Sequence, residues 1–261
     1  MMMKGVGVIL RNELFCLFVS TTTYISTFYF LCIIGLGFRL FLESFHSTNW
    51  ILPPLSCLSV GLIFGSPALI PFLTMRSIAE ERRLGTLETL MSAPISAASL
   101  IIGKWGASFI FFIIICLGAY AFPLSMCFYF PEQAISLGFN LPEQWLGGIT
   151  FLMIFGSSFT AIGIFSSSIT KNQMVAGMLT FSLISISLGI MSVSYGDVMP
   201  IDNTNFIEHL FHSIGGSISG GLDKLQSFSL GIVDLSTIFH QLILVFFFLS
   251  LATLQVEKMR H

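Results

Sequence analysis

The chain has 261 residues, of which 54% are hydrophobic and only 9% are charged, and its formal net charge is −2. Soluble domains carry about 25% charged residues, so this composition excludes an ordinary water-soluble protein and predicts that lipid covers most of the surface. The near-neutral charge gives no indication of a nucleic-acid or polyanionic partner.

The first predicted element is an amphipathic helix over residues 4–18 (KGVGVILRNELFCLF), in which apolar side chains surround Arg11, Asn12 and Glu13. We expect it to lie in the inner membrane interface. The uncharged run that begins within it, residues 14–38, is too long for a signal-peptide core and lacks a small-residue cleavage site. It is therefore interpreted as a retained membrane span.

Six stretches without Asp, Glu, Lys or Arg are long enough for the ~20 apolar helical residues that cross a bilayer. The predicted spans are 20–41, 56–75, 106–129, 146–168, 174–194 and 235–255. The sequence therefore predicts an all-α polytopic membrane protein that forms one domain over residues 1–261. Because the number of spans is even, both termini are expected on the same side.

The basic residues predict the orientation. Only Arg39 and Lys224 would lie on one side of the membrane, and the other nine would lie on the side that holds the termini. The positive-inside rule places that second side in the cytoplasm.

The outer segment 196–233 contains NFIEHLFHSIGG, which predicts a short amphipathic helix between Asn205 and Gly215. His209 and His212 stand three residues apart beside Glu208, a spacing that could hold a metal ion. The same residues form the polar face of an amphipathic helix, and this is the favoured interpretation. The five cysteines have no paired spacing either, so no metal site is predicted.

The cytoplasmic segment 76–104 differs from its surroundings because it holds seven of the chain's 24 charges. Gly85 is expected to end one helix, and Thr86 to cap a new one with Glu88 in its first turn. Leu87, Leu90 and Met91 form an apolar stripe on this new helix, and Pro94 is expected to end it. Ser96 is expected to cap the helix that follows. The pattern predicts a short helix over 86–92 that fits a cleft on another protein. The alternative is a connector whose charges only fix orientation.

No phosphate-binding loop is present. The one Gly-Lys pair, Gly103-Lys104, is followed by Trp105, and Ala98 stands where the motif's first glycine belongs. The chain is therefore not expected to bind or hydrolyse ATP by itself.

Intramembrane proteolysis is the strongest enzyme alternative, since GSSF (156–159) and His240 resemble parts of a serine protease. Ser158 falls near the middle of its span whereas His240 lies near the outer end of another, and a Ser–His pair must come within hydrogen-bond reach. The doublet Glu80-Glu81 resembles an EExxxR protease signature, but position 85 is Gly. An enzyme is not predicted.

A proton-coupled carrier should place titratable residues at membrane depth. Only Arg39 and Asp234 come near the predicted spans, and Asp234 is also a good N-cap for the last helix. An energy source outside the chain is therefore expected.

The stretch PFLTMRSIAEERRLGTLETLMSAPISAASLIIGKW strongly resembles the signature cytoplasmic segment of ABC type-2 transporter permeases, and among them the gliding-motility permease subunits. The residues that match the pattern are Met75, Arg76, Ala79, Glu80, Glu81, Gly85, Thr86, Glu88, Leu90, Pro94, Ser96, Gly103 and Lys104. FSSSITKNQMVA (165–176) is similar to the family's turn between spans four and five, and SFSLGIVDL (227–235) to the start of its last span.

The resemblance implies the transmembrane subunit of an ATP-binding cassette transporter, usually an exporter, in the bacterial cytoplasmic (inner) membrane. Six helices would form half of the translocation pathway, so the chain should pair with itself or with a related permease. A separate cytoplasmic ATPase would bind ATP–Mg, and the permease itself would need no cofactor. The residues expected to contact this ATPase are Arg76, Glu80, Glu81, Arg82, Gly85, Thr86, Glu88, Leu90, Pro94, Lys104, Asn172 and Gln173. The alternative is a membrane scaffold that anchors a cytoplasmic partner without transport.

Overall fold

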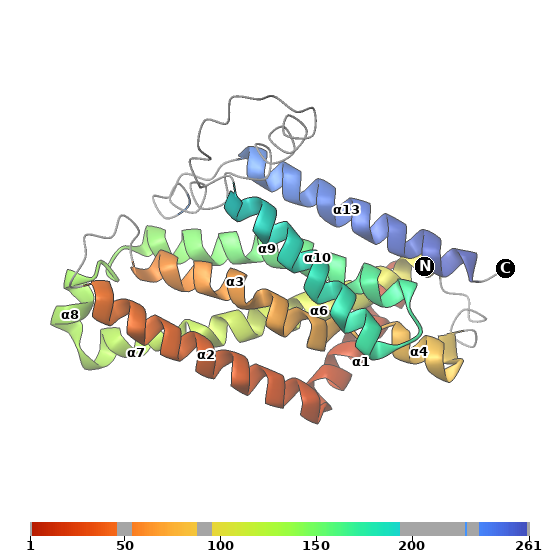
Figure 1. Cartoon of the computed structure of the whole chain (residues 1–261), viewed down its shortest axis with the longest axis horizontal. Helices are drawn as coiled ribbons and strands as arrows, with labels where there is room; N and C mark the ends of the chain where they lie inside the picture. The colour runs from red at the N-terminus through yellow and green to blue at the C-terminus, as the bar shows by residue number, and fades with distance from the viewer. Residues whose placement is uncertain (1, 46–53, 88–95, 194–227, 229–234, 260–261) are drawn as a thin grey trace.

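The computed structural model describes residues 2–45, 54–87, 96–193, 228 and 235–259, and these residues form helices and turns without a strand. Six long helices run roughly along one axis (Figure 1). They are α2 (Thr21–Phe45), α3 (Pro54–Thr74), α6 (Ala97–Ala119), α9 (Pro142–Ile169), α10 (Gln173–Val193) and α13 (Leu235–Lys258). The predicted all-α class is confirmed for this part of the chain.

Five stretches of the described chain are long and apolar enough to cross a membrane: Thr21–Glu43, Pro54–Leu84, Ala97–Tyr129, Pro142–Ile169 and Leu235–Lys258. They coincide with five of the six predicted spans. The sixth prediction, residues 174–194, falls on α10, whose described apolar part, Gln173–Gly189, is shorter than the length required. Five membrane spans are therefore supported, and the sixth, over residues 174–194, remains a prediction.

The predicted span 106–129 lies within the apolar stretch Ala97–Tyr129, which the structure divides into two helices. Helix α6 already begins at Ala97, and Tyr120 separates it from a second helix, α7 (Ala121–Tyr129). Pro123 lies in the first turn of α7 and has no N–H to continue the hydrogen bonds of α6, which accounts for the break. The short helix α8 (Pro131–Ser136) follows, at the opposite end of the bundle from α4 (Ala79–Leu84) (Figure 1).

The N-terminal helix α1 (Met2–Val19) confirms the helix predicted over 4–18, while its position in the membrane interface remains a prediction. The chain changes direction between α1 and α2, at Ser20 (Figure 1). The beginning of α1, the end of α13 and α4 lie at the same end of the bundle (Figure 1). We call this the basic end, since Arg82, Arg83 and Lys258 lie there.

Helix α9 lies at the centre of the bundle because its glycines admit neighbouring helices closely. A Cβ atom on Gly156 would lie 2.4 Å from Phe112 of α6, and one on Gly163 would lie 2.4 Å from Oγ1 of Thr74 of α3. Membrane helices pack through such small residues, because lipid is as apolar as the side chains and gives no hydrophobic force between helices.

The outer helix predicted over 205–215, with His209 and His212, lies outside the described residues, and so does Asp234. The same holds for Glu88, Leu90 and Pro94 of the predicted coupling helix.

We predict that Gly163→Ala destabilises the bundle by about 1–3 kcal/mol. The added Cβ would lie 2.9 Å from Cβ of Thr74, a stiff β-branched residue whose hydroxyl also donates to the carbonyl of Ile70 (2.9 Å). Thermal unfolding in detergent should show a melting temperature lowered by several degrees.

Gly118→Ala is the matched control, since a Cβ there meets no atom within 4 Å among the described residues. It should leave the melting temperature unchanged or slightly raised, because alanine is the better helix former. Equal melting temperatures for both variants would show that α3 and α9 are not packed as described.

Candidate functional site: the ionic junction at the basic end

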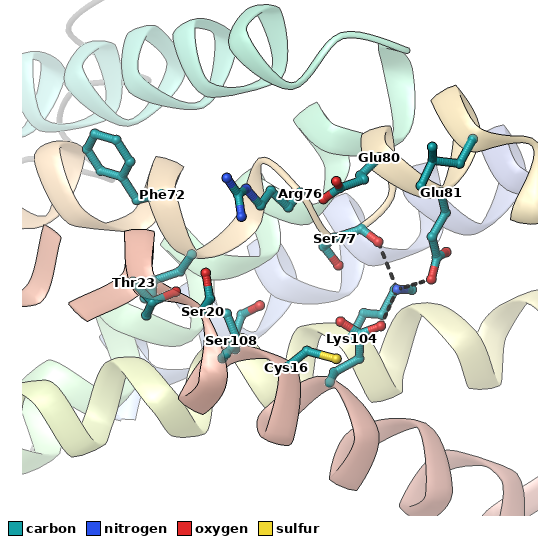
Figure 2. A pocket seen from close by; sticks show the side chains of 14 residues that line it. Cys16, Ser20, Thr23, Phe72, Arg76, Ser77, Glu80, Glu81, Lys104 and Ser108 are labelled. Carbon is teal, nitrogen blue, oxygen red and sulfur yellow. Dashed lines mark hydrogen bonds and ion pairs between the residues drawn. The ribbon is translucent and has the colours of Figure 1, made fainter. Parts of the chain in front are cut away.

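Lys104 of α6 is the one charged side chain among the described residues that is fully buried, with 1% of its surface exposed. Its ammonium group donates to three oxygens: Oε1 of Glu13 at 2.5 Å, Oε1 of Glu81 at 2.8 Å and the backbone carbonyl of Ser77 at 2.8 Å. Figure 2 shows the contacts to Glu81 and Ser77. Because an ammonium group has three protons, all of its hydrogen-bonding capacity is used within the chain.

The acceptors come from separate elements: α1 carries Glu13, the turn after α3 carries Ser77, and α4 carries Glu81. Lys104 thus joins α1, α4 and α6. A buried charge is tolerated only where opposite charges and hydrogen bonds satisfy it. We call Lys104 and its three acceptors, on Glu13, Ser77 and Glu81, the ionic junction. This junction fixes the position of α4 relative to α1.

Close packing brings α1 to this position. A Cβ atom on Gly103 would lie 2.9 Å from Ile9 of α1 and 3.3 Å from the carbonyl oxygen of Val6. The Gly103-Lys104 pair of the sequence motif thus has a physical explanation. Glycine admits α1 against α6, and the next residue supplies the cation that holds it.

The turn between α3 and α4 is held by Ser167 near the end of α9. The Ser167 hydroxyl accepts hydrogen bonds from the backbone N–H groups of Ile78 and Ala79, both at 3.1 Å. These two amides lie at the start of α4, where helix N–H groups have no partner within the helix. Ser167 therefore stabilises the start of α4.

Arg82 ties the same helix to the end of α9. Its guanidinium donates to the carbonyl oxygens of Ser168 (3.3 Å) and Ile169 (2.9 Å). These carbonyls belong to the C-terminal turn of α9, where a positive charge is favoured by the helix dipole. The contact places α4 beside the turn at residues 170–172.

That turn contains two of the predicted interface residues. Asn172 is exposed and its side-chain oxygen accepts from the N–H of Met174 (3.0 Å), which caps α10. Gln173 is half-buried and begins α10. The structure thus brings together two predicted segments, 76–87 and 172–173, that lie far apart in the sequence.

Gly85 ends α4 as predicted, with φ = 72°, a left-handed conformation that favours glycine. Thr86 is exposed, and its hydroxyl donates back to the carbonyl of Glu81 (3.2 Å). Leu87, predicted to belong to an apolar stripe for a partner protein, is instead 4% exposed and packs within the chain beside Ile78 and Leu100. Burial of this apolar side chain inside the bundle explains the difference.

The predicted interface residues divide into two groups. Arg76 and Thr86 are exposed and Glu80 is half-exposed at the basic end. Lys104 is buried and the side chain of Glu81 points toward it, so both position α4 rather than present a charge outward. Their role in contacting an ATPase stays a prediction.

Sequence reasoning did not identify Glu13, Ser77 or Ser167 as parts of this junction. One signal was available, because Glu13 is an acidic residue beside a span and the basic Lys104 precedes another. Charges at such positions are favoured when they pair. Nothing in the sequence indicated Ser167, which is one of three consecutive serines.

Ser158, considered above as a protease nucleophile, donates to the side-chain oxygen of Gln241 (2.6 Å) from within the bundle. This bond joins α9 to α13. In helical membrane proteins such hydroxyl contacts serve helix packing, so the structure gives no support to the protease interpretation.

The fold and junction describe a multi-pass helical membrane protein with a charged, tightly held turn at one end. Residues 44–218, more than half of the chain, match the family described as ABC-2 family transporter protein. The chain therefore belongs to the ABC-2 transporter family, whose members are generally non-catalytic membrane subunits. Among curated proteins none matches the sequence.

We predict that Lys104→Met destabilises the protein by about 3–5 kcal/mol, because Glu13 and Glu81 are left facing each other without a cation. The triple variant that adds Glu13→Gln and Glu81→Gln should recover most of this loss, since no buried charge remains. Chemical or thermal unfolding in detergent measures both effects.

Arg83→Met is the control: Arg83 is exposed and makes no ion pair among the described residues, so its removal should change stability by less than about 0.5 kcal/mol. A Lys104→Met variant as stable as the control would mean that the junction does not hold the helices together.

Proposed function

We propose that the chain is the permease subunit of an ATP-binding cassette exporter, paired with a second permease and driven by a separate ATPase at the basic end. Family membership supports the permease assignment. The observation that carries the coupling is the ionic junction, because Lys104 links α4 to both α1 and α6.

The junction suits the transmission of a mechanical signal. A partner that displaces α4 acts on α1 and α6 through Lys104, and on α9 through Arg82 and Ser167. A displacement of α4 without these helices would expose or separate a buried charge, at a cost of several kcal/mol. The proposed signal therefore reaches three helices of the bundle from one short helix.

The docking surface consists of the exposed side chains of this end. Arg76, Arg83 and Leu84 are exposed, and Leu84 is an apolar residue with 63% of its surface exposed, next to charged neighbours. Interfaces commonly combine an apolar anchor with a charged rim. In the orientation proposed from the basic residues, this surface faces the cytoplasm, where ATP is available.

A second permease is proposed because helices α2 and α13 carry large exposed apolar side chains, such as Phe28 (71%) and Phe246 (77%). Lipid and a second subunit are the two environments that cover such faces. One permease subunit with a packed centre is consistent with a protein that forms half of the translocation pathway.

A membrane scaffold remains the alternative function. It would bind the same ATPase without coupling, so hydrolysis would be the same with and without the permease. A transporter would instead change the rate of hydrolysis in proteoliposomes.

For docking, we predict that Leu84→Asp and Arg83→Glu weaken association with the ATPase, by about tenfold or more each. Both residues are exposed, so the membrane domain should fold and accumulate normally. Co-purification of the tagged ATPase measures association. Glu81→Lys is not a suitable probe, because it would place a second ammonium group against Lys104 and disturb the fold.

Glu132→Lys in α8 is the matched control, since α8 lies at the opposite end of the bundle (Figure 1) and should leave association unchanged. Full association by both α4 variants would place the docking surface elsewhere.

For orientation, we predict that a membrane-impermeant thiol reagent labels Glu132→Cys but not Thr86→Cys on intact cells, after the native cysteines are replaced. Both positions are exposed and lie at opposite ends of the bundle. Labelling of Thr86→Cys from outside would reverse the proposed orientation and remove the ATPase from this end.

A further inference from the structure

The segment α7–α8, at the opposite end of the bundle from the ionic junction (Figure 1), carries three consecutive exposed aromatic side chains. They are Phe128, Tyr129 and Phe130, with 79%, 79% and 55% of their surfaces exposed, and we call them the aromatic patch. The patch comprises the last two residues of α7 and the residue that follows it. Grouped apolar side chains on a surface indicate an interaction with a membrane or a partner.

The segment that carries the aromatic patch is packed firmly against the bundle. Three residues in and after α8 are buried in the main apolar core: Ala134, Leu137 and Phe139. On α7, the ring of Phe122 lies against α2, where a Cβ atom on Gly35 would be only 2.9 Å from it. The depth of the patch in the membrane is therefore determined by the depth of the bundle itself.

The length of α6 shows where the far edge of the hydrocarbon layer lies. Lys104 and the carboxylates around it mark the edge near the basic end, because charges are costly at greater depth. No charged residue follows in the sequence until Glu132. Tyr120 stands 16 residues after Lys104, which corresponds to about 24 Å of helix. Since the hydrocarbon layer is about 30 Å thick, Tyr120 lies close to its far edge.

The contacts of Tyr120 support this level independently. Its hydroxyl shares a hydrogen bond with the hydroxyl of Ser59 (2.8 Å), and its ring centroid is 5.8 Å from that of Trp145. The indole N–H of Trp145 donates to the carbonyl of Phe139 (2.9 Å). Tyr and Trp gather at membrane edges because an apolar ring and a polar tip suit the boundary between acyl chains and headgroups.

The aromatic patch lies just beyond this edge. Helix α7 adds nine residues after Tyr120, so the patch is at most about 14 Å farther along, and less because the helix bends there. The headgroup layer on each side of the hydrocarbon is about 5–8 Å thick, which is where the patch falls. Consecutive helical residues point about 100° apart. A protein partner covers one face of a helix, whereas lipid surrounds its end on several sides, so the arrangement favours lipid.

We propose that α7–α8 is an interfacial anchor whose aromatic patch inserts into the headgroup layer of the far leaflet, the leaflet opposite the basic end. Phe128 and Phe130 contact the upper parts of the acyl chains, and the hydroxyl of Tyr129 contacts the headgroups. The apolar stretch Ala97–Tyr129 then crosses the hydrocarbon as α6 and ends in the headgroup layer as α7.

The test measures the depth of a nitroxide label at Tyr129→Cys in the full-length protein, with the native cysteines replaced, in phosphatidylcholine vesicles. Oxygen concentrates in lipid and a nickel chelate stays in water, so the ratio of their collision rates with the label reports its depth. Two reference labels bracket the scale: Phe28→Cys, exposed on the apolar span α2, and Thr86→Cys, exposed at the basic end. The Tyr129→Cys ratio should exceed that of Thr86→Cys severalfold and remain below that of Phe28→Cys.

Three results would overturn the proposal. A ratio equal to that of Thr86→Cys would place the patch in water. A label at Tyr129→Cys that neither reagent reaches would mean that protein covers the patch, as in a contact with a second subunit. A ratio equal to that of Phe28→Cys would place the patch within the hydrocarbon and not among the headgroups.

A second measurement keeps an aromatic ring at the labelled position. In Tyr129→Trp, the added fluorescence relative to the unmodified protein should be quenched more by lipids brominated near the headgroup than by lipids brominated near the chain ends. The opposite order, or no quenching by either lipid, would contradict the proposal. Neither measurement involves the ATPase, so failure of the anchor would leave the proposed coupling through Lys104 unaffected.

Discussion

The burial of one ammonium group determines how the helices of the basic end are arranged. Lys104 is withdrawn from water, and an unpaired charge in that position is prohibitively unfavourable. Glu13, Glu81 and the carbonyl of Ser77 must therefore stay in place, and with them α1, α4 and the turn after α3. A buried ion pair is weak evidence for stability compared with an apolar core. Its effect is to specify one arrangement, because any displacement of α4 that leaves α1 behind separates the charges.

Close helix packing is the second constraint, and it makes this arrangement possible. Gly103 admits α1 against α6, and Gly163 admits the end of α3 against α9. In lipid, the force between helices comes from such contacts and from hydrogen bonds such as that between Ser158 and Gln241. The apolar exterior of α2 and α13 is left for lipid or another subunit, and we propose that the charged residues of the basic end contact the partner ATPase.

Most of the long helices could be predicted from the sequence, because a helix that crosses a membrane needs a long stretch without charged residues. Such stretches can be recognised directly in the sequence. The stop at Gly85 and the cap at Ser96, which accepts from the N–H of Ser99 at 3.2 Å, follow from local rules. The interruption at Tyr120 was missed, although Pro123 indicates it. The inward direction of Lys104, Glu81 and Leu87 could not be predicted, since it depends on contacts with α1 and α9 that are distant in the sequence. For the same reason the resemblance identified the motif but not the part that Glu13 plays in it.

The central claim is that a partner ATPase acting on α4 moves α1 through Lys104. The most direct measurement places an environment-sensitive fluorophore on α1, at Arg11→Cys, in the reconstituted complex. A second preparation carries the label directly after α4, at Thr86→Cys, so that the docking residues Arg83 and Leu84 stay unchanged. In labelled proteins that keep Lys104, Glu13 and Glu81, ATP should change the fluorescence of both labels. In the triple variant Lys104→Met, Glu13→Gln, Glu81→Gln, the account predicts that the α4 label still responds while the α1 label does not. An α1 response of the same size in both proteins would contradict it, because the signal would then reach α1 by another route.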